Sequence, residues 1–165
     1  KHDLAAYLTR GSGHNEDAHY SEKPEDFTYL LDRLARKYET AKDYVPSPII
    51  DYVEDARFGL IAYGSTDAAI EECRDQIRIE CGTEVSYLRL RSLPLVNEVV
   101  EFVSAHEMVF VVEQNRDGQV GDIIRLAVGG DIVKVKSILH YNGLPIDAQS
   151  VTDHLIDMAH IKRIT

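Results

Sequence analysis

The residues best suited to chemistry lie in one short stretch, RGSGHNEDAHYSEKPED, which covers positions 10–26. It contains His14, Glu16 and His19, and imidazole and carboxylate groups serve as zinc ligands and as general acids and bases. A zinc site needs three or four ligands held by rigid elements, whereas these residues lie on a glycine-flanked loop without cysteines. A metal-dependent hydrolase that uses this loop is therefore an alternative and not the main interpretation.

Two polar turns that follow apolar runs offer a second place for chemistry. In an open α/β sheet, ligands bind outside the carboxyl ends of the strands, beside helix N-termini. One interpretation is a pocket for an anion or a carboxylate. The other is that Ser65 or Thr66 caps a helix and that the glycines form tight turns. Neither turn is a GxGxxG motif or a phosphate loop with its lysine. The candidate crevice residues are Gly64, Ser65, Thr66, Glu113, Asn115 and Gly118.

The remaining reactive side chains predict structural roles. The sequence contains no nucleophile elbow, no HExxH and no CxxC. Cys73 and Cys81 are eight residues apart on an expected helix, roughly 12 Å along its axis, so they cannot form a disulfide with each other. We expect reduced, half-buried thiols, which suit the cytoplasm. Because iron–sulfur clusters usually take four cysteines, two are too few. We assign no catalytic, cofactor-binding or metal-ligating residue.

Length and charge narrow the class of protein. A chain of 165 residues suffices for one domain with its own core and an appendage. Its 44% hydrophobic and 28% charged residues are typical of a soluble globular protein. The net charge of −10 without a basic stripe argues against nucleic-acid binding, and no apolar run approaches the roughly 18–20 residues of a membrane span. The chain begins at Lys1 without a signal peptide, so we expect a piece of a longer cytoplasmic polypeptide.

Hydrophobic periodicity divides the chain into three parts. Residues 1–23 mix glycine, histidine, serine and acids without a period, which predicts a loop. Residues 24–46 are predicted to form a connecting helix, because apolar residues recur at three- and four-residue steps until prolines end the pattern. In residues 47–165, short apolar runs alternate with amphipathic stretches. This alternation predicts a mostly parallel sheet that is covered by helices on both faces, and the prolines beside PIIDYVED make that segment an edge strand.

Local signals predict several boundaries within the α/β part. Gly82 is expected to end one helix, and Asp147 is expected to cap the N-terminus of the last one. The stretch EVSYLRLRSL alternates as a strand. A glycine pair at 129–130 is predicted to end another helix, and IVKVKSILHY is predicted to be the last strand, with two solvated lysines.

Several motifs, taken in order, resemble those of a known family. The segment 10–40 is similar to part of the α subunits of 2-oxoacid:acceptor (ferredoxin) oxidoreductases, where a TG.HNE.GH loop precedes a charged connecting helix. Further along, AYGST resembles the family's GWGST, YLRLRSLPL its HLR.LNPLP, VVEQNRDGQV its VEMN.GQL, and NGLPIDAQSV its G.PFTA.EI. The similarity covers nearly the whole chain, and the 2-oxoglutarate-type α subunits look closest. Tyr63, where the family often has tryptophan, and the charge pair in NRDG depart from the pattern.

The resemblance implies a fold and a role within a complex. The fold would be transketolase C-terminal-like, a three-layer α/β/α sandwich with a mostly parallel five-stranded sheet and PIIDYV as its antiparallel edge strand. Its strand order would be 1-3-2-4-5, so that the two polar turns face each other across one crevice. The parent complex would decarboxylate a 2-oxoacid on thiamine diphosphate with magnesium, reduce ferredoxin through an iron–sulfur cluster and release an acyl-coenzyme A. In this family those groups lie on the β subunit or the preceding pyrimidine-binding domain. Residues 47–165 would then be a non-catalytic assembly domain, and residues 1–23 a remnant of the preceding domain.

The resemblance also gives the opening loop a role. His14, Asn15, Glu16 and His19 would supply hydrogen bonds and charge where the loop meets the β subunit or the rest of the α subunit. Two alternatives remain: a stand-alone α/β module that binds a small anionic ligand or a regulator at the crevice, and the metal-dependent hydrolase. The apolar face of the helix at 24–46 also allows pairing with a second copy, which would give a homodimer.

Overall fold

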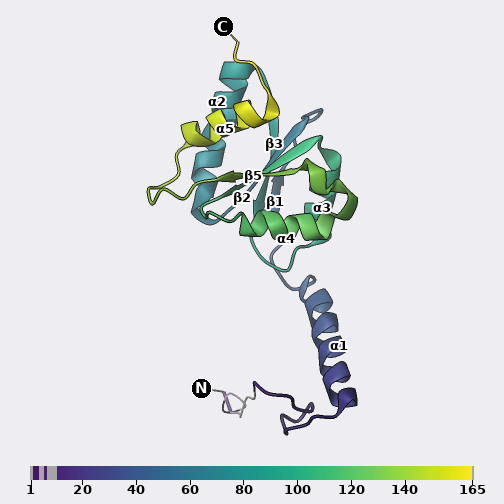
Figure 1. The fold of residues 1–165 in the computed structure, drawn as a ribbon. Helices are drawn as coiled ribbons and strands as arrows, with labels where there is room; N and C mark the ends of the chain where they lie inside the picture. The colour runs from purple at the N-terminus through teal and green to yellow at the C-terminus, as the bar shows by residue number, and fades with distance from the viewer. Residues whose placement is uncertain (1, 4–5, 7–10, 165) are drawn as a thin grey trace. The chain divides into compact units, whose positions relative to one another are not determined.

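The structure, a computed structural model, describes residues 2–3, 6 and 11–164. The chain divides into two compact units, Lys1–Tyr44, called the helical unit, and Val45–Thr165, called the α/β unit (Figure 1). The elements in order are α1 Pro24–Ala41, β1 Ile49–Asp51, β2 Phe58–Tyr63, α2 Asp67–Cys81, β3 Val85–Leu90, α3 Asn97–Ala105, β4 Met108–Glu113, α4 Gln119–Val128, β5 Val135–Leu139 and α5 Ala148–Ala159. Within the described residues, no helix has the length and apolar character that crossing a membrane requires.

Helix α1 begins where the sequence predicts. Pro24 occupies the first turn, and Glu25 and Asp26 place negative charge at the positive end of the helix. The helix ends at Ala41, and the following residues form turns that lead to the prolines. None of the side chains of Pro24–Ala41, all of which the structure describes, is buried. The helix therefore exposes its apolar residues.

The sheet of the α/β unit has the order β1-β3-β2-β4-β5. Strands β3, β2, β4 and β5 are mutually parallel, whereas β1 pairs antiparallel with β3 through Ile50 and Leu88. The predicted fold class and strand order are therefore confirmed, including the antiparallel edge strand. Strands β2 and β4 lie side by side in the middle of the sheet, so their carboxyl ends share one edge.

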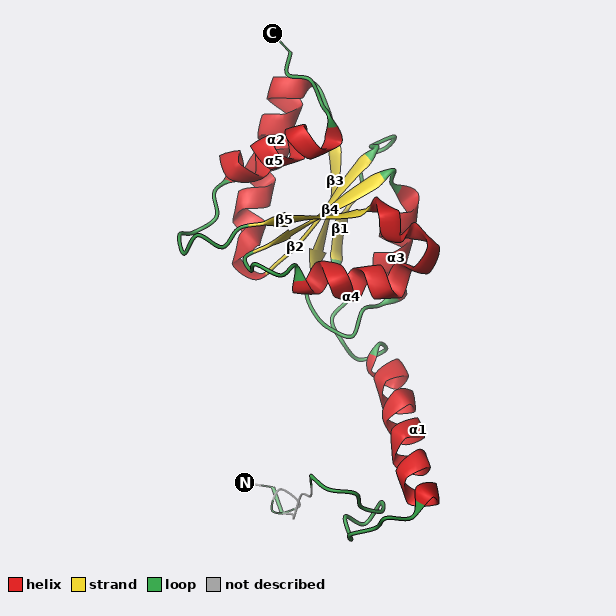
Figure 2. Cartoon of the chain, viewed as in Figure 1, coloured by secondary structure: helices red, strands yellow, loops and turns green. Residues whose placement is uncertain are grey.

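Helices cover both faces of this sheet (Figure 2). Helices α2 and α5 pack on one face and bury a cluster that includes Ile70, Cys73, Phe110 and Leu155. Helices α3 and α4 pack on the other, where Phe102 and Ile124 are fully buried. Because each large apolar side chain buried in this way contributes about 1.5–3 kcal/mol, the two layers hold the strand ends in place.

The local signals at two helix ends are confirmed. Gly82 follows α2 with φ of 61°, a left-handed conformation that glycine adopts without strain. Asp147 caps α5, and its carboxylate accepts a hydrogen bond from the backbone N–H of Ser150 at 2.8 Å.

Two predictions about β3 and β5 need correction. The strand predicted in EVSYLRLRSL is confirmed as β3, but its alternating sequence does not expose one face: five of its six residues are buried, because β1 and β2 flank it and helices cover both faces. The glycine pair does end a helix as predicted, because α4 stops at Val128 and Gly129 is its C-cap. Residues Gly129–Lys134 then form a 3-10 helix, so β5 starts only at Val135 and not at Ile132. Lys134 is thus outside the strand, and its ammonium group donates to the carbonyl of Ser104 at 3.0 Å.

Candidate functional site

The two predicted turns lie next to each other at the shared edge of β2 and β4. The turn Gly64–Thr66 follows β2 as a single 3-10 turn, and Gln114 begins the loop after β4. The side-chain amide of Gln114 donates to Thr66 Oγ1 at 3.1 Å and to Ser65 Oγ at 3.4 Å. Gln114 was not among the predicted crevice residues, yet it is the residue that joins the two turns.

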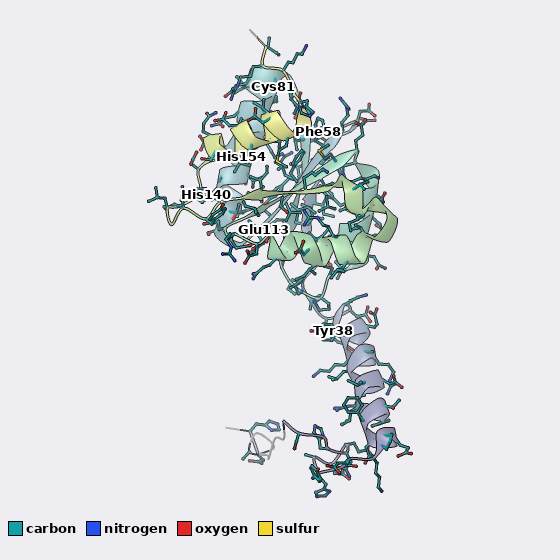
Figure 3. The ribbon with its side chains drawn as sticks, viewed as in Figure 1. Tyr38, Phe58, Cys81, Glu113, His140 and His154 are labelled. Carbon is teal, nitrogen blue, oxygen red and sulfur yellow. The ribbon has the colours of Figure 1, made fainter. Side chains whose placement is uncertain are left out.

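Glu113, the last residue of β4, lies at the centre of this edge (Figure 3). Its side chain is fully buried. The carboxylate accepts hydrogen bonds from the backbone N–H of Val120 and from that of Gly121, both at 2.8 Å. Asn115 Nδ2 donates to the same carboxylate at 2.8 Å, and the Tyr63 hydroxyl lies 3.5 Å from it. A buried carboxylate is stabilised only when its oxygens are paired in this way.

Helix α4 therefore begins on a negative charge that the chain itself supplies. The N–H groups of a first helical turn have no partner within the helix and attract anions. Glu113 takes two of them, and Asn115 Oδ1 accepts from the backbone N–H of Gly118 at 2.7 Å. The donors that a bound anion would use at α4 are thus already occupied.

Tyr63 lines the same place with a protonated hydroxyl. Burial raises the pKa of this phenol, and the negative charge of Glu113 raises it further. The hydroxyl therefore keeps its proton and donates toward Glu113 Oε2, while Asn115 Nδ2 lies 3.5 Å from its oxygen. A phenol held in this way is a hydrogen-bond donor and not a base.

Two glycines of the crevice are required by the backbone. Gly64 has φ of 61° and Gly118 has φ of 64°, both in the left-handed region that side chains disfavour. A Cβ on Gly118 would also stand 3.3 Å from Ser137 Oγ. Both glycines therefore form the tight turns that were predicted. The predicted helix cap is wrong, because Thr66 at the N-cap of α2 makes no side-chain capping hydrogen bond and its hydroxyl accepts from Gln114 instead. Ligand binding at these turns stays a prediction.

The opening loop forms a small hairpin held by its own hydrogen bonds. His14 and Tyr20 form an antiparallel bridge, and the Asn15 N–H donates to the His19 carbonyl at 2.8 Å. Asn15 Oδ1 accepts from the backbone N–H of His19 at 2.9 Å, and His14 Nδ1 lies 2.7 Å from the Asn15 carbonyl. Asn15 thus orders the loop, while Glu16 and His19 are exposed at its surface.

The described residues of the loop do not assemble a metal centre. Across the parts of the chain that the structure describes, no group of three or more histidine, cysteine, aspartate or glutamate side chains is placed to hold a metal ion. Cys73 is fully buried and not half-buried as predicted, because it faces the sheet beneath α5. Burial raises the pKa of its thiol to about 11, so it is a poor nucleophile and ligand.

A polar cluster at the start of α2 escaped the sequence reasoning. The buried Tyr87 hydroxyl donates to Asp67 Oδ1 at 2.8 Å, and Arg89 pairs with Asp67 Oδ2 at 3.1 Å. Burial raises the pKa of Tyr87, and its hydrogen bond to Asp67 adds to the shift. The cluster ties the first turn of α2 to β3. The sequence signal for this cluster was Arg89, because an arginine in a strand that helices cover needs a negatively charged partner.

Comparisons with known proteins show that the chain is similar to part of certain oxidoreductase subunits. It is 24% identical over 149 residues to the α subunit of 2-oxoacid:ferredoxin oxidoreductase 1 of Sulfurisphaera tokodaii, a match that covers 88% of this chain and 23% of the relative. The α subunit of the 2-oxoacid:ferredoxin oxidoreductase of Saccharolobus solfataricus is 25% identical over 148 residues, or 87% of this chain and 23% of the relative. No protein-family model matches the chain.

Among solved structures, the fold is shared with a 2-oxoglutarate:ferredoxin oxidoreductase from Magnetococcus marinus that has 2-oxoglutarate, coenzyme A and succinyl-CoA bound. The TM-score is 0.76 at 22% identity, and the match covers 93% of this chain and 27% of that one. The chain thus spans about a quarter of the length of the proteins it matches. The resemblance drawn from the motifs is confirmed at the level of 2-oxoacid:ferredoxin oxidoreductase α subunits, while the 2-oxoglutarate-type assignment stays a prediction.

Proposed function

We propose that this chain is a non-catalytic assembly part of the α subunit of a 2-oxoacid:ferredoxin oxidoreductase, of the 2-oxoglutarate type. The observation that carries the proposal is the extent of the similarity. Two α subunits of such enzymes match 87–88% of the chain, in a segment that makes up 23% of each relative. The complete enzyme would oxidatively decarboxylate a 2-oxoacid, form an acyl-coenzyme A and reduce ferredoxin.

The chain's own residues do not fit the cofactors of that reaction. An iron–sulfur cluster usually takes four cysteines, whereas this sequence has two, and Cys73 is fully buried in the core. Thiamine diphosphate and its magnesium ion need a site for a diphosphate, but the N-terminal donors of α4 already bind Glu113. These two observations support the proposal that the cofactors belong to other parts of the complex and that this chain contributes structure.

The opening loop is proposed as a contact with those other parts. Its backbone is ordered by Asn15, so the exposed Glu16 and His19 are presented on a defined hairpin and not on a free strand. His14 is half-buried at the base of the same hairpin. We place the β subunit or the preceding segment of the α subunit against this surface, with Glu16 as the charged group that selects a basic partner.

A small-anion function for the crevice finds little support in the geometry. The carboxylate of Glu113 is buried among the predicted crevice residues, and a second negative charge beside it would be repelled. Ser65 is exposed, and its hydroxyl accepts a hydrogen bond from the side-chain amide of Gln114. Metal-dependent hydrolysis has no ligand cluster among the described residues.

Reconstitution tests the proposal. The 165-residue chain is mixed with the oxidoreductase β subunit and the preceding α-subunit segment from the same organism, and the complex is isolated by size-exclusion chromatography. The proposal predicts a stoichiometric complex that contains this chain. Partners that assemble and reduce a ferredoxin or viologen acceptor equally well without it would contradict the proposal.

A further inference from the structure

Helix α1 carries an apolar stripe with the spacing of a coiled-coil seam. Phe27, Leu31, Leu34, Tyr38 and Ala41 follow one another at steps of four, three, four and three residues. Apolar residues that repeat every 3.5 residues form a continuous stripe along one side of a helix, and two helices of a coiled coil pack together along such stripes. The side chains are uncovered in the helical unit: Phe27 is 61%, Leu34 49% and Tyr38 66% exposed.

The charges of α1 are unequally distributed along its length. The half from Lys23 to Asp32 holds three carboxylates and one lysine, whereas the half from Arg33 to Lys42 holds four basic residues and one glutamate. Two copies side by side in parallel would set like halves against each other. Antiparallel copies would set the acidic half of each helix against the basic half of the other. The two helix dipoles would then point in opposite directions, which is also favourable.

We propose that α1 is a self-pairing surface, and that two copies of the chain join through an antiparallel, two-fold symmetric pair of α1 helices. Placing Leu34 opposite its counterpart on the two-fold axis sets Phe27 against Ala41 of the second copy, so that a large side chain meets a small one. The same register brings Asp26 near Lys42 of the second copy. Two-fold pairing of one patch with itself is the commonest arrangement of homo-oligomers.

A hollow on the surface of α1 can receive one side chain of the second copy, as in the knobs-into-holes packing of coiled coils. It has a volume of about 380 Å³ and is lined by the apolar side chains of Phe27, Leu30, Leu31 and Leu34, together with Arg33 and residues 11–14 of the opening loop. In the antiparallel register, Tyr38 of the second copy stands over this hollow. Tyr38 projects from the helix in the isolated chain (Figure 3), so its ring is available to fill the space.

The size of the seam sets the strength of the pairing. The exposed parts of its four large side chains amount to roughly 400 Å² per helix, given about 150–250 Å² for a whole side chain of this size. A total of about 800 Å² is smaller than the roughly 1,000 Å² that a stable specific interface buries, so the pairing is weak and transient. The dimer is therefore reversible, and the apparent mass of the chain should rise from that of the monomer toward that of the dimer as its concentration increases.

Cysteine cross-linking of the full chain, in a Cys81→Ser background, tests both the pairing and its direction. Leu34→Cys is expected to form a disulfide-linked dimer under mild oxidation. Phe27→Cys alone should remain monomeric, whereas a mixture of Phe27→Cys and Ala41→Cys chains should cross-link. Efficient cross-linking of Phe27→Cys alone, or none with Leu34→Cys, would overturn the proposal.

Sedimentation of the wild-type chain and two matched variants completes the test. Leu34→Asp is expected to raise the concentration of half-dimerisation at least tenfold, and circular dichroism should show the α/β unit intact, because α1 contributes no side chain to its core. Tyr29→Ala removes an exposed aromatic outside the seam and should leave the dimer unchanged. A wild-type chain that stays monomeric to 100 μM, or a Tyr29→Ala effect equal to that of Leu34→Asp, contradicts self-pairing. These readouts need no partner, so they are independent of the proposed function.

Discussion

Glu113 Oε1 accepts the backbone N–H of Gly121 at 2.8 Å, and this bond ties the carboxyl end of β4 to the first turn of α4. The same carboxylate holds the N–H of Val120 and the amide of Asn115. One buried side chain therefore sets the geometry of the whole edge where the predicted crevice lies.

Replacing Glu113 should be costly to the fold. Glu113→Ala leaves buried N–H donors without an acceptor, and each such loss costs about 1–3 kcal/mol, so we expect a decrease of about 2–4 kcal/mol in the free energy of unfolding. Urea denaturation measures the change. The control is Asp117→Ala, which removes an exposed carboxylate from the same loop and should change stability by less than about 0.5 kcal/mol. Equal effects of the two variants would refute the capping role of Glu113.

Strand β2 passes so close to α3 that it tolerates no side chain at Gly59. A Cβ there would lie 2.7 Å from the ring of the fully buried Phe102. We expect Gly59→Ala to lower the free energy of unfolding by about 1–3 kcal/mol, the usual range for overpacking a core. Gly130→Ala is the matched control, because a Cβ at Gly130 meets nothing within 4 Å. Thermal unfolding measures the midpoint of each variant. Equal midpoints for the two variants would argue against close packing between Gly59 and Phe102.

The sequence was most informative where a pattern repeats over many residues. Short apolar runs and amphipathic stretches reflect how each segment is buried. Their alternation predicted which segments form strands and which form helices, and that helices cover both faces of the sheet. The motif resemblance supplied the strand order, which no local pattern contains. Asp147 and Gly82 were predicted because a cap depends only on the residues next to it.

The sequence was least informative where tertiary contacts decide. Glu113 looked like one more polar residue after a strand, and its role depends on the N–H groups of Val120 and Gly121, seven and eight residues on. Gln114 joins the turns across a separation of 48 residues. Lys134 seemed part of a strand, but its contact with Ser104 lies outside any local pattern.

The buried thiol of Cys73 should make stability depend on alkaline pH. Its pKa is raised from 9.0 to about 11 in the folded chain, mainly because burial disfavours the thiolate. The folded state therefore holds the proton more tightly, and the stability that this provides is complete below pH 9 and is lost as pH rises from 9 to 11.

Cys73→Ala removes this dependence. Between pH 8 and pH 10, the wild type should lose about 1 kcal/mol more stability than Cys73→Ala, because one pKa unit corresponds to about 1.4 kcal/mol. Urea titrations at a series of pH values measure the difference. Parallel stability curves for the two proteins would show that the thiol keeps its ordinary pKa.

The proposed contact at the opening loop predicts a loss of affinity on charge reversal. Glu16 is exposed and its neighbour Asn15 holds the hairpin, so Glu16→Lys should leave the loop folded. We expect binding to the β subunit and the preceding α-subunit segment to weaken several-fold, and deletion of residues 1–23 to weaken it at least tenfold. Isothermal titration calorimetry provides the values, with Glu71→Lys on the surface of α2 as control. Unchanged affinity of the deletion variant would remove the loop from the interface.

The central claim is that this chain supports an enzyme complex but performs no turnover itself. The most direct measurement is reduction of a viologen acceptor by the purified chain supplied with 2-oxoglutarate, coenzyme A, thiamine diphosphate and magnesium. The account predicts no reduction by the chain alone and rapid reduction once the β subunit and the preceding α-subunit segment are added. Sustained reduction by the chain without a second polypeptide would contradict it.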